Sequence, residues 1–323
     1  MKKDYQQLLN ESDDWLKYAI RLHLFHEPKE TLVELRKTSL KDERIQKYLF
    51  DISNFHGSLV TSHKNPDLPI QKLLFLLDLG FDTEIPEIKK AIDQMLLHKD
   101  ENGVFQSMTN VPKHFGGTGQ DVFSWCLCDA PLLLLALYKT GADYNKLIKP
   151  GIDYLISLCR SNGFPCAVSE ELGKFRGPGR KDDCCPYATL IMADLLSYIP
   201  EYKDSPTALT AVNSLLDLWE NSNEQHPYMF FMGTDFRKLK APSCWYDLLS
   251  VAGTLSKYNF THQDPRFLEM MKVIRSKQNE EGLFIAESAY LKMKDWDFGQ
   301  KKTPSSYLTY LCYRIYERLE QAI

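Results

Sequence analysis

Three cysteines recur along the chain at a constant spacing: Cys126, Cys185 and Cys244 lie 59 residues apart in turn. An almost wholly apolar run follows each of them, so the sequence predicts that each cysteine opens a buried helix. A thiol at a helix N-terminus can have a lowered pKa, which suits either metal ligation or nucleophilic attack. Thiolate ligands would select zinc or an iron–sulfur centre rather than magnesium. The alternative is that these small residues only let helices pack closely, since free cysteine is among the most buried residue types.

Other possible metal ligands lie near these cysteines. Asp183 precedes Cys185 by two residues, and Cys166 lies in the loop before the same predicted helix. Cys128 follows Cys126 by two residues, about 200° around a helix, so we expect only one of this pair to face a shared site. The candidate ligands for a thiolate-bound metal such as zinc are Asp183, Cys185, Cys244, Cys126 and Cys166.

Two aspartates are the candidate catalytic residues. Asp129 and Asp247 each follow one of the recurring cysteines by three residues, which would place them on nearly the same face of the predicted helices. A carboxylate on an otherwise apolar helix is unfavourable unless it is paired. We therefore expect either a chemical role for Asp129 and Asp247 or a structural one, in which each caps or bonds a neighbouring loop.

Aromatic and cationic side chains gather at the predicted starts of the apolar helices and in the loops before them. Aromatic faces can line an apolar cavity or stabilise a ligand cation. Lysine and arginine, together with helix N-termini, can hold an anionic headgroup such as a diphosphate. Core packing and solvated loop charge are the alternative explanations. The candidate ligand-binding residues are Trp125, Tyr187, Arg237, Lys238, Trp245, Tyr246, Lys301 and Tyr307.

A repeat of about 60 residues positions these side chains. Gly103, Gly163 and Gly282 each follow a polar turn, and a phenylalanine comes one or two residues after each glycine. The interval from the second glycine to the third is about twice that from the first to the second. Each repeat reads as an apolar helix, a tight turn, an amphipathic helix and a long polar loop. The predicted amphipathic helices are residues 87–97, 147–158, 208–219 and 266–277.

An apolar helix must be covered on all sides, whereas an amphipathic helix needs only one covered face. Two concentric rings satisfy both, so we predict an all-α (α/α) toroid of about five helical hairpins plus a closing helix at 305–319. The apolar helices would form the inner ring and the amphipathic helices the outer one. The prediction is a single domain over 1–323, in which residues 1–60 form divergent N-terminal helices and residues 61–323 carry the repeats. An open helical solenoid is the alternative architecture.

The repeat motif resembles that of a known superfamily. The turn Gln278-Asn279-Glu280-Glu281-Gly282-Leu283-Phe284 is similar to those of terpenoid cyclases, including squalene cyclases, and of protein prenyltransferase β subunits. The segments Cys126-Leu127, Gly163-Phe164-Pro165-Cys166, Cys184-Cys185 and Trp245-Tyr246-Asp247-Leu248-Leu249 resemble uncharacterised bacterial proteins with prenyltransferase/squalene-cyclase-like repeats. The resemblance implies the toroid and an isoprenoid-like ligand.

Two departures separate the chain from those enzymes. Class II terpene cyclases use a D-x-D-D motif as their acid, and the sequence contains none. Protein prenyltransferases bind zinc through an Asp and a Cys two residues apart and a His at the next inner helix. Asp183 and Cys185 have the first spacing, but the sequence around Cys244 has no histidine. The family zinc set is therefore incomplete, and the resemblance leaves open whether the protein is an enzyme.

The composition limits the classes of binding partner and the cellular compartment that we expect. The chain of 323 residues has a formal net charge of −4, which argues against a nucleic-acid partner. It has no apolar run near the ~20 residues that span a bilayer and no export signal at its start. Its eight cysteines are too sparse for a disulfide scaffold, so we expect reduced thiols and a cytoplasmic protein.

Three functions fit these observations. The first is a terpenoid cyclase/prenyltransferase-like toroid that binds a small amphipathic or anionic, isoprenoid-like ligand in a central cavity. The second is a non-catalytic binding or scaffold toroid. The third is a carbohydrate-active (α/α) barrel enzyme, in which two carboxyl groups would face each other across the cavity.

Overall fold

The computed structural model describes residues 3–177, 180–222, 224, 226–227 and 230–321. The fold is all-α, as the sequence predicts: the described residues form fourteen α-helices and one small antiparallel sheet. None of the described helices has the length and apolar character that crossing a bilayer requires. The helices are α1 (Tyr5–Glu11), α2 (Asp14–His23), α3 (Val33–Ser39), α4 (Glu43–Ile52), α5 (Pro69–Asp78), α6 (Pro86–Met95), α7 (Ala130–Lys139), α8 (Lys149–Ser157), α9 (Pro186–Ser197), α10 (Pro200–Lys203), α11 (Pro206–Glu220), α12 (Leu248–Leu255), α13 (Pro265–Arg275) and α14 (Ser306–Glu320).

The chain divides into two compact units. Unit 1 consists of Met1–Tyr48, Asp78–Gly80 and Met232–Ile323, and unit 2 consists of Leu49–Leu77 and Phe81–Phe231. Each unit contains its own set of buried apolar residues.

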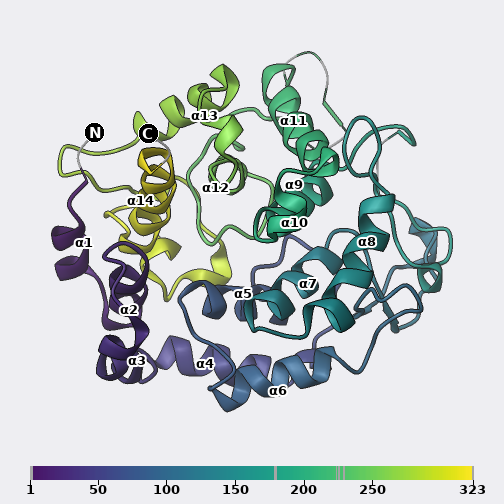
Figure 1. The fold of residues 1–323 in the computed structure, drawn as a ribbon, viewed down its shortest axis with the longest axis horizontal. Helices are drawn as coiled ribbons and strands as arrows, with labels where there is room; N and C mark the ends of the chain where they lie inside the picture. The colour runs from purple at the N-terminus through teal and green to yellow at the C-terminus, as the bar shows by residue number, and fades with distance from the viewer. Residues whose placement is uncertain (1–2, 178–179, 223, 225, 228–229, 322–323) are drawn as a thin grey trace. The chain divides into compact units, whose positions relative to one another are not determined.

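The predicted helical hairpins are seen most clearly in unit 2. All of α7 from Ala130 to Leu137 is buried, and α9 is buried at every position except Asp194. By contrast α11 buries one face. Helix α9 packs against both α7 and α11 (Figure 1). An all-round buried helix followed by a one-sided helix is the pairing that the hydrophobic pattern predicts.

A small sheet in unit 2 leads the chain into α7. Strand β1 (Ser107–Thr109) pairs antiparallel with β2 (Val122–Ser124), with Ser107 opposite Ser124. After β2, Cys126 forms a bridge with Val168, so the segment before α7 is held against the loop that precedes α9.

Unit 1 brings the two ends of the chain together. Helix α14 contacts α1, α2 and α12, and α12 also contacts α13 (Figure 1). The ring of Trp15 in α2 lies 5.6 Å from that of Tyr307 in α14 and 4.9 Å from that of Trp296. The predicted closing helix is therefore present as α14, and it packs on the first helices of the chain.

The glycine turns of the repeat have one conformation. Gly103, Gly163 and Gly282 have φ of +83°, +107° and +95°, a region that residues with a Cβ atom rarely adopt. In the second and third turns the phenylalanine that follows the glycine is held in the same way. The Phe164 N–H donates to Thr189 Oγ1 at 3.0 Å, and the Phe284 N–H donates to Thr309 Oγ1 at 3.0 Å. The repeat seen in the sequence is thus a repeat of backbone geometry.

Two of the three recurring cysteines, Cys126 and Cys244, lie outside the helices that they were predicted to open. Helix α7 begins at Ala130 and α12 at Leu248, with Asp129 and Asp247 at the N-cap positions. Only Asp247 makes a side-chain cap hydrogen bond, which it accepts from the Ser250 N–H. Cys185 is itself the N-cap of α9. The prediction that Cys126 and Cys128 point to different sides of one helix is therefore wrong, since neither residue is helical.

Candidate metal centre

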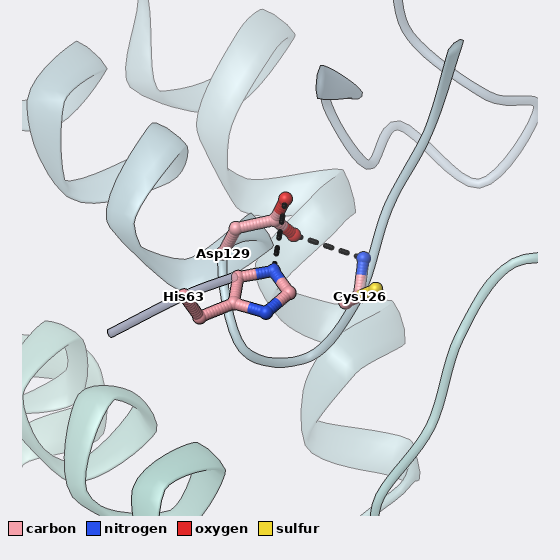
Figure 2. Close-up of side chains that lie close together, drawn as sticks. All are labelled: His63, Cys126 and Asp129. Carbon is pink, nitrogen blue, oxygen red and sulfur yellow. Dashed lines mark hydrogen bonds and ion pairs between the residues drawn. The ribbon is translucent and has the colours of Figure 1, made fainter. Parts of the chain in front are cut away.

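Three side chains of unit 2 place metal-ligating atoms close together. His63, Cys126 and Asp129 each offer one ligand atom, and these atoms all lie within 4.8 Å of one another. Asp129 and Cys126 are buried, and the His63 side chain is 21% exposed. Figure 2 shows the imidazole and the carboxylate turned toward each other, with the Cys126 sulfur beside them.

Local backbone structure holds these donors in place. The Cys126 N–H donates to Asp129 Oδ1 at 2.9 Å, so the turn before α7 orients the carboxylate (Figure 2). His63 lies in a turn closed by the hydrogen bond from the Asn65 N–H to the Ser62 carbonyl at 3.2 Å. The second carboxylate oxygen, Oδ2, is left facing His63 Nε2 at 3.6 Å.

The residues fit a zinc ion. Asp129 Oδ2 and His63 Nε2 are buried atoms without a hydrogen bond to any described residue. Two N or O ligands of tetrahedral zinc, each bonded at about 2.0–2.1 Å, lie about 3.3–3.5 Å apart, close to the separation of these two atoms. A cation shared by Asp129, His63 and the Cys126 sulfur would satisfy both atoms. Three protein ligands with a further position left open is the pattern of catalytic zinc sites.

The Cys126 thiol needs such a cation in order to ionise. Burial raises the pKa of Cys126 well above its ordinary value, and the Asp129 carboxylate raises it further. The thiol is therefore protonated at neutral pH in the absence of a nearby cation. Metal binding would displace this proton, because only the thiolate is a strong ligand.

Further thiols lie beside the three donors. Electrostatic interaction with Cys166 and Cys185 also raises the pKa of Cys126, which indicates that these three predicted ligands lie near one another. Cys166 accepts a hydrogen bond from the Gly177 N–H at 3.0 Å. Interaction with Cys128 lowers the pKa of Cys185, and interaction with Cys185 raises that of Cys128.

The other predicted metal ligands have different neighbours. Asp183 Oδ2 accepts from the Arg180 N–H at 3.1 Å, and Asp183 is not in the group of three donors. Cys244 belongs to unit 1, where Tyr290, Asp247 and Lys240 are the groups that act on its thiol. Burial raises the pKa of Cys244 to about 12.

The two candidate catalytic aspartates lie in different units, and each has one buried carboxylate oxygen without a hydrogen bond to a described residue. Asp247 is 3% exposed, and its Oδ1 accepts from the Ser250 N–H and from Ser250 Oγ, both at 2.9 Å. Its Oδ2 is buried without a hydrogen bond to a described residue, as is Oδ2 of Asp129. Burial raises the pKa of Asp247 to about 6. Capping, the structural role that the sequence left open, accounts for one oxygen of Asp247.

The predicted ligand-binding residues are distributed over both units. In unit 2, Trp125 is buried and donates from Nε1 to Asp100 Oδ2 at 2.8 Å, and Tyr187 is buried at the start of α9. The remaining six belong to unit 1 and differ in exposure: Tyr246 and Tyr307 are buried, Trp245, Arg237 and Lys238 are partly exposed, and Lys301 is exposed.

Sequence reasoning missed His63 and Cys128. His63 lies in a loop before the first clear repeat and has no counterpart at the repeat spacing. Its distance from Cys126 in the sequence, 63 residues, also differs from the interval of 59 between the recurring cysteines, so no pattern in the sequence pointed to it. Cys128 was set aside only because a helix was expected at that position.

No known protein-family model matches the chain, and no curated protein matches it. Solved structures similar to the chain include the type II terpene cyclase MstE from Scytonema, with 12% sequence identity, 96% of this chain and 89% of that chain covered, and a TM-score of 0.45. A variant of MstE in complex with geranylgeranyl dihydroxybenzoate has 11% identity, 96% and 88% coverage, and a TM-score of 0.44. A protein from Actinoplanes has 10% identity, 96% and 90% coverage, and a TM-score of 0.41.

Proposed function

We propose that the protein binds zinc through His63, Cys126 and Asp129 and uses this centre to bind, and to act on, a small amphipathic anion of the isoprenoid type. The observation that carries the proposal is the buried pair formed by Asp129 Oδ2 and His63 Nε2, two polar atoms that lack hydrogen bonds and face each other beside a thiol. A buried carboxylate is strongly unfavourable unless a positive charge lies close to it, and a metal ion bound between these two atoms would supply that charge and satisfy both atoms.

The donor types support this assignment. Aspartate, cysteine and histidine are the zinc ligands of the protein prenyltransferases that the repeat resembles. The arrangement here is different, because the cysteine precedes the aspartate by three residues and the histidine comes from an earlier loop. The proposal therefore concerns a site made by this chain's own residues.

The surroundings of the centre suit a ligand with a charged head and an apolar tail. Asp129 and Cys185 are the N-caps of α7 and α9, whose N–H groups favour negative charge. The side chains of the same two helices are mostly apolar, the kind of surface that a hydrocarbon chain buries favourably. Zinc, when bound, supplies a Lewis acid with an open position for a thiolate or a phosphate oxygen.

The roles of the protein residues follow from their contacts. The Cys126 N–H orients the Asp129 carboxylate, and Cys126 gives up its thiol proton when the metal is bound. His63 binds through Nε2, which requires that ring nitrogen to be unprotonated. The eight cysteines are all free, and free thiols persist in a reducing compartment, so we propose a cytoplasmic protein.

Metal analysis of the purified protein tests the centre. We expect about one zinc per chain, and we expect D129N and H63A to weaken metal binding by at least ~10-fold, because each removes a ligand. In cobalt-substituted protein, C126S should remove the thiolate-to-cobalt absorption. D183N is the matched control, since Asp183 is a carboxylate of the same unit outside the group of three donors, and it should retain the metal. Loss of metal in D183N but not in D129N would contradict the assignment.

Ligand binding is tested separately by thermal stability with farnesyl diphosphate, inorganic diphosphate and farnesol. We expect the largest increase in Tm with farnesyl diphosphate, because only this probe has both the head and the tail. A free concentration of 100 times Kd would stabilise the folded protein by about 2.7 kcal/mol. Protein that holds zinc but shows no shift with any probe would leave the metal centre standing and refute the isoprenoid ligand.

A further inference from the structure

Two histidines and a phenylalanine of unit 2 have their rings in contact beside the small sheet. The rings of His98 and Phe123 are stacked, with centroids 3.3 Å apart and planes at 7° to each other. The ring of His56 meets both of them edge to face, with its centroid 5.0 Å from each. Phe123 is the middle residue of β2, and all three side chains are partly exposed, so protons from the solvent can reach the two imidazoles.

Hydrogen bonds hold His56 in place and fix the position of its proton. Gln94, in the last turn of α6, donates from Nε2 to the Ser53 carbonyl at 2.9 Å and accepts from the Phe55 N–H at 2.8 Å. His56 Nε2 lies 3.0 Å from the Gln94 carbonyl oxygen. A carbonyl oxygen only accepts, so Nε2 carries the proton of the neutral ring and Nδ1 is the atom that takes up a second one.

His98 connects the segment after α6 to the sheet. Its carbonyl accepts the Gln106 N–H at 3.0 Å, and its imidazole contacts the rings of Phe123 and His56. Phe123 in turn lies opposite Met108 of β1. The stacked rings therefore hold β2, and through it the hairpin, against the end of α6.

Protonation of both imidazoles opposes this packing. Burial lowers the pKa of His98. Burial also lowers the pKa of His56, the Gln94 carbonyl acts in the opposite direction, and the charge of His98 lowers it further. One imidazolium can rest on the face of the phenyl ring, which attracts a cation, but two positive charges at this distance repel each other. The second proton therefore favours separation of the rings.

Other charged groups of the neighbouring elements do not act on either pKa. Strands β1 and β2 contain no charged side chain. Among the described residues, His98 is the one charged group that shifts the pKa of His56, and burial is the one cause for His98. The charged residues of α6 and of the segments next to the two histidines, none of which acts on them, are Asp51, Glu87, Lys89, Lys90, Asp93, Lys99 and Asp100.

We infer that His56, His98 and Phe123 form an acid-sensitive clamp on β2. In the neutral state the stacked rings hold the strand that continues to Cys126. When both histidines are protonated, His98 leaves the stack, because His56 is held by its hydrogen bond to Gln94, and the hairpin loosens at this end. The neutral pair contributes stability above the pKa of unfolded histidine, and this contribution is lost as pH falls. The inference does not depend on the proposed function, since the clamp lies outside the group of three metal donors.

Proton uptake by the wild-type protein is the first test. The imidazole C–H signals of His56 and His98 would be followed by NMR from about pH 7.5 to about pH 5 in chelator-treated protein, so that release of a metal does not contribute. We expect two separate steps, both below the ~6.5 of an ordinary histidine. Uptake of both protons in a single step near 6.5 would overturn the inference. This measurement needs no variant, so it stands even if a substituted protein fails to fold.

Hydrogen exchange of residues 105–109 and 122–124 tests the opening itself. After correction for the intrinsic pH dependence of exchange, we expect these amides to exchange at least ~5-fold faster at about pH 5 than at about pH 7. H98F keeps a ring to stack on β2 and takes up no proton, so the increase should be absent. H114N, which replaces an exposed histidine of the same unit, should behave as wild type. No increase in wild type, or the same increase in H98F, would overturn the inference.

Discussion

At the scale of single residues, Asp247 and Asp129 each use one carboxylate oxygen to hold the local backbone and leave the other one buried. Each occupies the N-cap position of a largely buried helix and uses Oδ1 to accept a backbone N–H. In each, Oδ2 is buried without a hydrogen bond to a described residue. In Asp129 this oxygen faces a histidine beside a thiol, whereas in Asp247 the nearby ionisable groups are Lys240 and Cys244. We therefore expect zinc at the first position and a titrating carboxyl group at the second.

Asp247 should make the stability of the protein depend on pH. Burial raises its pKa from 3.8 to about 6, so the folded state holds this proton at pH values where the unfolded state has released it. The free energy of unfolding should fall as pH rises from about 4 to about 6, by about 3 kcal/mol in total. D247N keeps an oxygen for the cap and should lack this component in urea unfolding measured from pH 4 to pH 7.

Asp264 is the matched control for this measurement. It is the N-cap of α13, and the hydrogen bond from the Arg266 side chain lowers its pKa. The contribution of Asp264 to the free energy of unfolding should therefore be present above the pKa of the unfolded state and lost as pH falls. This pH dependence is opposite to that expected for Asp247. Unfolding curves for wild type and D247N that stay parallel across the whole pH range would contradict the assignment for Asp247.

At the scale of elements, the glycine turn between the outer helix of one repeat and the inner helix of the next is the recurring device. The hydrogen bonds that follow Gly163 recur after Gly282: the Cys185 N–H donates to the Phe164 carbonyl at 2.6 Å, and the Ser305 N–H donates to the Phe284 carbonyl at 2.8 Å. These bonds tie each turn to the N-cap of the next inner helix. They therefore place Cys185 in unit 2 and Ser305 in unit 1.

Replacing Gly163 by alanine should destabilise the protein more than the same change at Gly141. Both glycines have positive φ, +107° and +74°, so both substitutions carry backbone strain of about 1–2 kcal/mol. A Cβ atom at 163 would also lie 2.7 Å from Ser214 Oγ and 2.9 Å from Thr189 Oγ1, whereas at 141 it would meet nothing within 4 Å. We expect G163A to lose at least ~1 kcal/mol more than G141A in urea unfolding. Equal losses would show that the close contacts are relieved at no cost.

At the scale of the whole molecule, the first and last parts of the chain are packed together in unit 1. An open solenoid keeps its terminal repeats apart, because each repeat contacts only its neighbours. Here α1 and α2 contact α14, and His23 Nδ1 lies 2.6 Å from the Tyr310 hydroxyl. The contact between chain ends is what the toroid prediction requires, and closure of all the hairpins into one ring stays a prediction from the repeat.

Trp15 should therefore matter to the stability of the entire chain. Its side chain is 1% exposed and contacts the rings of Tyr307 and Trp296. W15A would remove a large buried side chain between α2 and α14, and we expect a loss of about 3–5 kcal/mol in the free energy of unfolding. The control F50A removes an aromatic ring that is 77% exposed and should stay within about 0.5 kcal/mol of wild type. A loss below 1 kcal/mol in W15A would mean that the terminal helices are not part of the cooperative core.

Much of the fold could be predicted because its signals are local. Apolar runs, amphipathic periods and glycine turns depend on residues a few positions apart, so the helices near 87, 208, 266 and 305 were found close to their true bounds. The starts of α7 and α12 were placed too early because the apolar or aromatic residues before each helix hide the cap at Asp129 and Asp247. Neither cap interrupts the hydrophobic pattern strongly enough to mark a boundary.

The candidate site depends on contacts that no local pattern encodes. The amino-acid sequence alone determined an all-α repeat protein with thiols and carboxylates at the recurring helix entrances, since periodicity and turn chemistry act over a few residues. Only the tertiary structure decided which of these side chains lie close together. His63 lies beside Cys126 and Asp129, Cys128 interacts with Cys185, and Cys244 has other neighbours. The physical reason is that packing of α7 and α9 and the course of a loop outside the repeat set distances between residues far apart in the chain.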